Sequence, residues 1–238
     1  MSPAQPELNE SSRHDSAEGD GSVSARGVRA LLHPFADGRS RPKAKEQEVL
    51  DVATQYFLEH GYQGASINAM ARSSGISKES IYRYFSSKKQ LFEAVIGREL
   101  AEYQAGVRRL LSAEKTMSLR DALVTIAETV LAVVTADRTL ALRRLIFDEA
   151  RRSPDVGQHY YRIGPEQALT AVEEIFKSHR TEHDLDPAAL SRYFLGMIFW
   201  PLVLGRECAL TPPPTREEIR AHVEPIVNDF LKAFVKGR

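Results

Sequence analysis

The chain has 238 residues, of which 42% are hydrophobic and 27% are charged, a composition typical of a soluble globular protein. Its single cysteine, Cys208, excludes a disulfide framework and a metal cluster held by cysteines. The formal net charge is zero, yet residues 41–90 carry eight basic and five acidic side chains, so positive charge is concentrated in one short segment.

Residues 1–41 are rich in Ser, Gly, Pro, Asp and Glu, and we expect them to form a disordered arm because they hold too little apolar material to order themselves. No apolar run in this arm resembles a signal peptide. The longest apolar stretch, residues 194–204, is shorter than the ~20 residues that span a bilayer. We therefore expect a soluble, cytoplasmic protein with no membrane segment.

From Pro42 onward the apolar residues recur at spacings of three and four, which predicts a helix that Gly61 closes. Ser66 and Ser77 are predicted N-caps of the next two helices. Gly75 stands between these two helices, where a left-handed residue is needed and glycine adopts it without steric cost.

The two short helices form a helix-turn-helix pattern, in which the second helix enters the DNA major groove. Ile81 and Phe85, one turn apart, are expected to face the core from this second helix. The local excess of basic residues agrees with a DNA-reading unit.

The rest of the chain also reads as helical, and no run alternates with a period of two, so the predicted fold is all-α. Ser87 and Gln90 fit a capping box at the start of a long fourth helix. Pro165, Pro201 and Pro225 are expected to kink or interrupt the helices that contain them. The further helices are predicted at residues 88–111, 118–135, 139–152, 158–180, 187–209 and 215–235.

Residues 43–96 resemble the N-terminal DNA-binding domain of TetR/AcrR-family transcriptional regulators. The matching features are Ala53, Phe57, Gly61-Tyr62, Ala71, Gly75-Ile76-Ser77, Ile81-Tyr82-Arg83-Tyr84-Phe85, Lys88-Lys89 and Leu91-Phe92. Residues 144–171 more weakly resemble the C-terminal domain of the AefR-like subset. The resemblance implies a helix-turn-helix domain at residues 42–90 and a larger helical ligand-binding and dimerisation domain at residues 91–238.

By this resemblance, the protein is a homodimeric regulator, most often a repressor that a small molecule releases from a palindromic operator. Lys78, Tyr82 and Arg83 are then expected at bases, and Tyr84 and Lys88 at phosphates. The alternative for Tyr82 and Tyr84 is that they only pack. The complete predicted DNA-binding set is Lys43, Ser66, Arg72, Ser77, Lys78, Ser80, Tyr82, Arg83, Tyr84 and Lys88.

Aromatic residues are frequent in the C-terminal part, and they are expected either to build plain core or to line an apolar cavity for an effector. The effector that suits such walls is an apolar or amphipathic small molecule. The predicted ligand-binding set is Tyr103, Arg144, Phe147, His159, Tyr161, Phe176, Met197 and Trp200.

Dimerisation is predicted through the last two long helices, which we expect to form a four-helix interface with their copies around a two-fold axis. The apolar stripe of the final helix consists of Ile219, Val223, Ile226, Val227, Phe230 and Phe234. The alternative is that both helices cover their own core.

Enzymatic chemistry has no support, because no nucleophile is paired with a base and no glycine loop is suited to hold phosphate. His179 and His183 could be metal ligands, but the favoured interpretation is that they belong to a solvated helix end. No cofactor is expected. Two other classes remain open, a constitutive DNA-binding protein without an effector and a helical enzyme or lipid carrier. The effector, the operator, the regulated genes and the sign of regulation do not follow from the residues.

Overall fold

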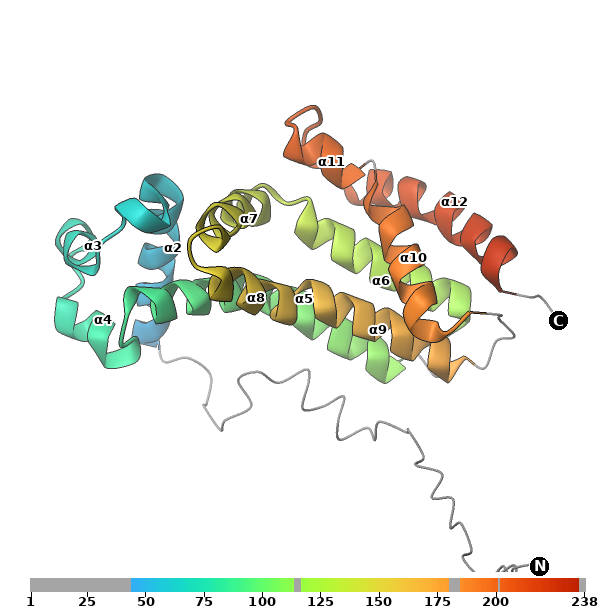
Figure 1. Cartoon of the computed structure of the whole chain (residues 1–238), viewed down its shortest axis with the longest axis horizontal. Coiled ribbons are helices and arrows are strands. Elements are labelled where there is room, and N and C mark those ends of the chain that lie inside the picture. The colour runs from blue at the N-terminus through green and yellow to red at the C-terminus, as the bar shows by residue number, and fades with distance from the viewer. Residues whose placement is uncertain (1–43, 114–116, 180–184, 201, 236–238) are drawn as a thin grey trace, which may run out of the picture.

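The computed structural model describes residues 44–113, 117–179, 185–200 and 202–235, and within these ranges every regular element is an α-helix (Figure 1). The all-α prediction is confirmed. The helices are α2 Ala44–Gly64, α3 Ile67–Ser74, α4 Lys78–Tyr84, α5 Lys88–Ala113, α6 Leu119–Val134, α7 Asp137–Ala150, α8 Pro154–Ile163, α9 Pro165–Ser178, α10 Pro187–Phe199, α11 Leu202–Glu207 and α12 Arg216–Phe234.

Local signals placed the starts of α3 and α4 and the end of α3 correctly, whereas α2 runs beyond its predicted end at Gly61 to Gly64. Ser66 Oγ accepts from the backbone N–H of Ala69 at 3.0 Å, and Ser77 Oγ accepts from that of Ser80 at 3.1 Å. Gly75 has φ 72°, and Gly61 has φ 69° and ψ 169°, which breaks the helical path three residues before α2 ends.

The capping box at the start of α5 is only half present. Ser87 Oγ accepts from the backbone N–H of Gln90 at 3.1 Å, as predicted. The Gln90 side chain accepts instead from the backbone N–H of Ser86, at 2.6 Å. The Gln90 carboxamide therefore stabilises the turn before α5 and does not bond to the backbone N–H of the cap residue Ser87.

The expected interruption at Pro165 is confirmed, but the two longest predicted C-terminal helices were wrong in length. The helix expected at residues 158–180 is split into α8 and α9 between Gly164 and Pro165, because proline disfavours helical backbone in the residue before it. The helix expected at residues 187–209 ends at Phe199, and α11 follows separately. Pro225, in contrast, lies inside a continuous α12.

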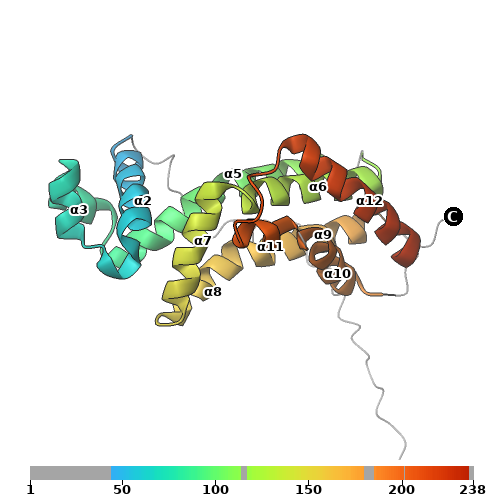
Figure 2. The same ribbon diagram turned by 90° about the horizontal axis from the view of Figure 1, so that it is seen from above.

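The helices form a head and a body joined by α5. Figures 1 and 2 show α2, α3 and α4 at one end of the molecule, with α5 extending from them along the body. In the body α12 packs on α6, and α10 packs on α9. Helix α5 is therefore a single continuous helix that belongs to both the head and the body.

Two apolar cores meet along α5. Its first turns, with Leu91, Phe92 and Val95, pack with the head and with α7 and α8. Its later turns, with Tyr103 and Val107, pack with α6, α9, α10 and α12. The predicted domain boundary at residue 90 lies within the first turn of α5. Because α5 contributes to both cores, the structure does not test this boundary, which stays a prediction.

Candidate nucleic-acid interface and ligand cavity

Helix α4 has one face buried in the head and the opposite face exposed to solvent. Ile81 is fully buried and Phe85 is 4% exposed, so both anchor the helix in the head, as expected. Lys78, Tyr82 and Arg83 lie on the exposed face of the same helix. The Lys78 ammonium group lies 5.6 Å from the centre of the Tyr82 ring, so the two side chains share one outer surface. This surface presents a cation, an aromatic ring and a guanidinium group to solvent.

Two of the neighbouring predicted residues, Arg72 and Ser77, line an open hollow together with Lys78. Ser66, Arg72 and Ser77 are exposed. Ser80 is half-buried, and its hydroxyl group accepts a hydrogen bond from that of Ser77 at 2.9 Å. Ser66 and Ser77 also cap α3 and α4, so their hydroxyl groups already have backbone partners. Lys43 lies outside the described residues.

The structure gives Lys88 partners inside the head. Its ammonium group donates to the carbonyl oxygens of Tyr62 at 2.9 Å and Ala65 at 3.0 Å, and it lies 4.4 Å from the centre of the Tyr62 ring. Lys88 thereby ties the start of α5 to the turn between α2 and α3. Tyr84 is half-buried and packs against the core of the head. Both residues are placed to support the surface of α4 from within.

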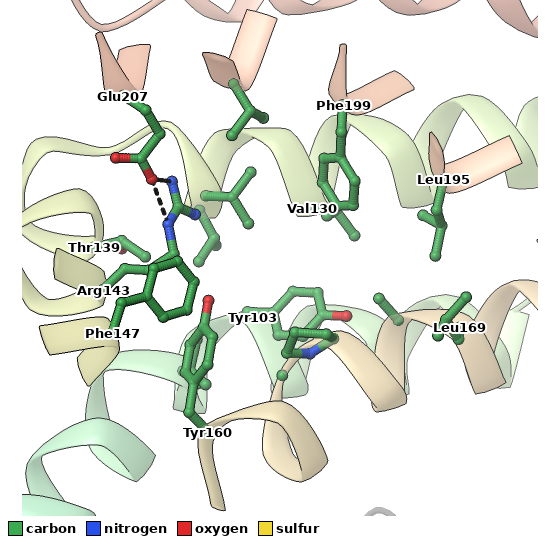
Figure 3. A pocket seen from close by; sticks show the side chains of 17 residues that line it. Tyr103, Val130, Thr139, Arg143, Phe147, Tyr160, Leu169, Leu195, Phe199 and Glu207 are labelled. Carbon is green, nitrogen blue, oxygen red and sulfur yellow. Dashed lines mark hydrogen bonds and ion pairs between the residues drawn. The ribbon is translucent and has the colours of Figure 1, made fainter. Parts of the chain in front are cut away.

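A cavity of about 420 Å³ lies in the body among α5, α6, α7, α8, α9, α10 and α11 (Figure 3). This volume falls within the 300–1,000 Å³ of typical small-molecule sites. Arg143, Phe147, Tyr160 and Glu207 gather at one end in the view, and Leu169 and Leu195 lie at the other. The cavity is therefore elongated, with its charged groups at one end.

The charged end is occupied by an ion pair. The Arg143 guanidinium group donates through Nε to Glu207 Oε1 at 2.7 Å, and a second donation comes from one of its terminal nitrogens. Arg143 is 6% exposed, so its guanidinium group is largely removed from water, whereas Glu207 is half-buried. Arg144, which is exposed, donates to the backbone carbonyl of Glu207 at 2.9 Å from outside the cavity. Thus α7 is joined to α11 beside the cavity.

Two tyrosine hydroxyl groups also belong to the cavity walls. Burial raises the pKa of Tyr160, an effect that the neighbouring Arg143 partly opposes, and Figure 3 shows the two residues close together. Burial also raises the pKa of Tyr103, whose hydroxyl group is buried without a hydrogen-bond partner among the described residues. Both groups remain neutral phenols at physiological pH and can donate one hydrogen bond each.

The cavity takes in only two members of the predicted ligand-binding set, Tyr103 and Phe147. The others lie elsewhere: Arg144 and Tyr161 are exposed, His159 is half-buried beside Glu93, Phe176 is core, and Met197 and Trp200 are exposed at a separate groove. For Arg144 and Tyr161 the lining residue is the immediate neighbour, Arg143 or Tyr160. One residue is a rotation of about 100° on a helix, so the neighbour points away.

Helical phase was the available signal for the missed residues. Arg143 continues the buried stripe of Thr139 and Ile146, and Tyr160 continues that of Val156 and Ile163. Glu207 had no such signal, because its position depends on the separate helix α11.

An exposed apolar surface covers one side of α10 and the adjoining part of α12. Tyr193, Met197 and Trp200 lie there with exposed fractions of 51%, 39% and 64%, and an open groove joins them to Ile226 and Phe234. Four members of the predicted α12 stripe are instead buried in the chain's own core: Ile219, Val223, Val227 and Phe230. These four residues therefore cover the core of their own chain, which was the alternative interpretation. The apolar surface that remains exposed for a partner lies mainly on α10.

Among the described residues, no group of three or more His, Cys, Asp and Glu side chains is arranged to hold a metal ion. The His179 ring nitrogens lie 2.8 Å from the Ile175 carbonyl oxygen and 3.1 Å from that of Met117, so this ring bonds to the backbone. His183 lies outside the described residues. None of the helices in the described ranges combines the length and the apolar character required to cross a bilayer.

Two family models match most of the described chain. The model described as "Bacterial regulatory proteins, tetR family" matches residues 49–95, and "AefR-like transcriptional repressor, C-terminal domain" matches residues 121–236. An uncharacterized HTH-type transcriptional regulator of Mycobacterium tuberculosis is 27% identical over 190 residues, which cover 77% of this chain and 86% of the relative.

Solved structures show the same architecture. A TetR-family transcriptional regulator from Mesorhizobium loti superimposes with a TM-score of 0.71 at 24% identity and covers 83% of this chain and 100% of its own. The "Flavonoid-responsive Regulator FrrA" superimposes with a TM-score of 0.68 at 29% identity, covering 82% of this chain and 98% of its own.

Proposed function

Because this chain belongs to the TetR family of bacterial transcriptional regulators, we propose that it is a homodimeric repressor that leaves a palindromic operator when a small molecule occupies its body cavity. The observation that carries the proposal is helix α4, which is anchored by Ile81 and Phe85 and exposes Lys78, Tyr82 and Arg83. A rigid helix with donors and a ring on its outer face suits the major groove.

The residues of this surface divide into base contacts and phosphate contacts. Arg83 and Lys78 supply the donors that recognise guanine edges, and the Tyr82 ring contacts bases beside them. Arg72, with the exposed cap residues Ser66 and Ser77, is proposed to bind phosphates and to set the register. Tyr84 and Lys88 are assigned a supporting role because they contact other parts of the head, and Ser80 because its hydroxyl group is hydrogen-bonded to that of the cap residue Ser77.

Dimerisation is supported by the apolar surface of α10. Tyr193, Met197 and Trp200 expose large side chains next to one another on this helix and the residue after it, and such a contiguous patch is costly to leave in water. A second copy applied around a two-fold axis covers the same patch on both subunits. The two heads then face a palindrome.

The proposed switch uses two helices. Helix α5 reaches from the head to Tyr103 in the cavity wall, and α7 carries Phe147 in that wall. On α7 the buried carboxylate of Glu149 accepts a hydrogen bond from Gln63 of α2 at 2.6 Å. A ligand that displaces α7 therefore disturbs a direct contact with the head. It shifts operator affinity only as far as it prefers the displaced form.

The sign of regulation and the kind of effector follow relatives. Repression is favoured because the C-terminal half matches a model of AefR-like transcriptional repressors. A small-molecule effector is favoured because FrrA, which is 29% identical, is described as flavonoid-responsive. The 420 Å³ cavity is of a size for such a molecule.

Selection of bound duplexes from random DNA tests the proposal. It should recover one motif with two-fold symmetry, and Lys78→Ala or Arg83→Ala should each weaken binding to that motif by about 1–3 kcal/mol. Lys177→Ala, an exposed charge on α9, is the matched control and should leave binding unchanged. Recovery of sequences without symmetry would contradict the proposal and favour a non-specific DNA-binding protein.

A further inference from the structure

The charged end of the cavity has little capacity for another charge. The Arg143 guanidinium group and the Glu207 carboxylate both line this end, and the first donates twice to a single oxygen of the second. Within the cavity lining these two charges cancel. The second cation near Glu207, Arg144, has its Nε 3.6 Å from Glu207 Oε2, but it is exposed and lies outside the lining. The rest of the lining is apolar apart from Thr139 and the hydroxyl groups of Tyr103 and Tyr160.

This arrangement disfavours charged ligands of either sign. An anionic ligand brought to Arg143 must stand beside the Glu207 carboxylate or displace it, and a cationic ligand meets Arg143 in the same way. Removing the partner of a fully buried charge typically costs ~3–5 kcal/mol. The cost is smaller here because Arg143 is buried but Glu207 is only half-buried. Ligands that are neutral avoid this cost.

A hydroxyl group suits the ion pair without breaking it. It can donate to the Glu207 carboxylate and accept from the Arg143 guanidinium group at the same time. Hydrogen bonds to charged partners are worth about 1.5–3 kcal/mol, roughly twice those between neutral groups. The Tyr160 hydroxyl group, which Figure 3 shows pointing toward Arg143, lies at this end as a further partner.

The remaining length of the cavity calls for an apolar body. A cavity of ~150 Å³ accommodates benzene, so the 420 Å³ here are enough for two to three ring-sized units. Leu169, Leu195 and Phe199 supply apolar walls away from the ion pair. Between the two ends, the Tyr103 hydroxyl group has no partner among the described residues. It offers a second hydrogen bond to an acceptor in the middle of a ligand.

We propose that the effector is a neutral, elongated molecule of two or three rings, with a terminal hydroxyl group that bridges Arg143 and Glu207. This inference rests on the proposed function, because it assigns the chemistry of the same cavity. It distinguishes this cavity from one built for a carboxylate or another anion.

Three probes of matched length test the proposal on the purified full-length chain. These are 4-phenylphenol, which is neutral at pH 7 because a phenol titrates near ~10, 4-methylbiphenyl, in which a methyl group replaces the hydroxyl, and biphenyl-4-carboxylate. Dissociation constants come from calorimetric titration, and the rise in the thermal midpoint provides a second reading. We expect 4-phenylphenol to bind about tenfold more tightly than 4-methylbiphenyl, and at least tenfold more tightly than the carboxylate.

The variant Glu207→Gln removes the negative charge beside Arg143 and should reverse the order of ligand affinities. It leaves Arg143 with an amide partner and Arg144 nearby, so biphenyl-4-carboxylate should gain at least tenfold in affinity and overtake 4-phenylphenol. Glu207 is half-buried on the short helix α11, and the thermal midpoint of the variant without ligand checks that it folds. Glu217→Gln, an exposed carboxylate in the first turn of α12, is the control and should leave all three affinities unchanged.

Three results would overturn the inference: tighter binding of the carboxylate than of the phenol to the natural chain, an unchanged order of affinities in Glu207→Gln, or binding of none of the three probes. Operator binding without probe is measured in parallel. If the chain binds its palindrome while the probe order fails, the effector chemistry is wrong and the regulator stands. If the probes bind in the expected order but the chain selects no operator, the proposed function is wrong and the cavity chemistry stands.

Discussion

Replacing Lys88 with methionine is expected to lower the free energy of unfolding by about 2–3 kcal/mol. The methionine side chain keeps the apolar stem but removes the ammonium group, which donates to the carbonyl oxygens of Tyr62 and Ala65 and lies over the Tyr62 ring. Hydrogen bonds that involve a charged group contribute about 1.5–3 kcal/mol each, and a cation over a ring about 0.5–1 kcal/mol. The sum is about 3.5–7 kcal/mol. Because Lys88 and Tyr62 are only half-buried, water replaces part of these interactions in the variant, and the expected loss lies below the sum.

The adjacent lysine is a matched control. Lys89 pairs with Asp155 and, at 3.9 Å, with Glu93, but its side chain is 46% exposed. Exposed ion pairs contribute between about 0 and 1 kcal/mol. Chemical denaturation of Lys88→Met and Lys89→Met should therefore give a large loss for the first and a small loss for the second.

DNA binding separates this role from a direct phosphate contact. If Lys88 mainly supports the head, the salt dependence of operator binding by the folded variant stays unchanged. If Lys88 instead neutralises a phosphate, the slope of log affinity against log salt falls by about one. A variant with wild-type stability and a flatter salt dependence would refute the structural role.

Three further outcomes are expected. Gly75→Ala should cost about 1–2 kcal/mol in chemical denaturation although its Cβ meets no atom within 4 Å, because φ 72° is strained for any residue with a Cβ; an unchanged stability would mean that the turn relaxes. Met197→Asp should give monomers by sedimentation and lose operator binding, whereas Lys177→Asp should remain dimeric; a monomeric natural chain would exclude the interface. Burial lowers the pKa of His159, so its contribution to stability is present above pH 6.5 and is lost as pH falls towards the lower pKa of the folded state; His159→Gln should show a smaller loss than the natural chain over that interval, and parallel curves would exclude the effect.

The head could be predicted because its signals are local. Ser66 and Ser77 bond to backbone N–H groups three residues ahead, and Gly75 satisfies a backbone need of its own position. The cavity could not be predicted to the same extent, because its lining depends on helical phase and on where long helices break. Arg144 was chosen where Arg143 lines the cavity, and Glu207 is brought there by a helix that the sequence merged with α10.

Lys88 shows another limit of the sequence. The resemblance to the DNA-binding domain of TetR/AcrR-family regulators predicted a phosphate contact for Lys88. Its two backbone acceptors lie 23 and 26 residues earlier in the chain, and no spacing rule brings these groups together. Only the packing of α5 on the end of α2 reveals them.

On the proposed switch, the strength of a single contact is enough to account for regulation. Glu149 is 2% exposed and accepts from Gln63 of α2 and from Ser153, while Arg143 and Phe147 of the same helix line the cavity. Loss of one hydrogen bond to a buried carboxylate costs about 1.5–3 kcal/mol, which is the range of a typical coupling free energy between two sites. A ligand that favours a form of α7 without the Gln63 contact therefore has sufficient leverage on the head. Linkage then requires operator DNA to weaken ligand binding by the same factor.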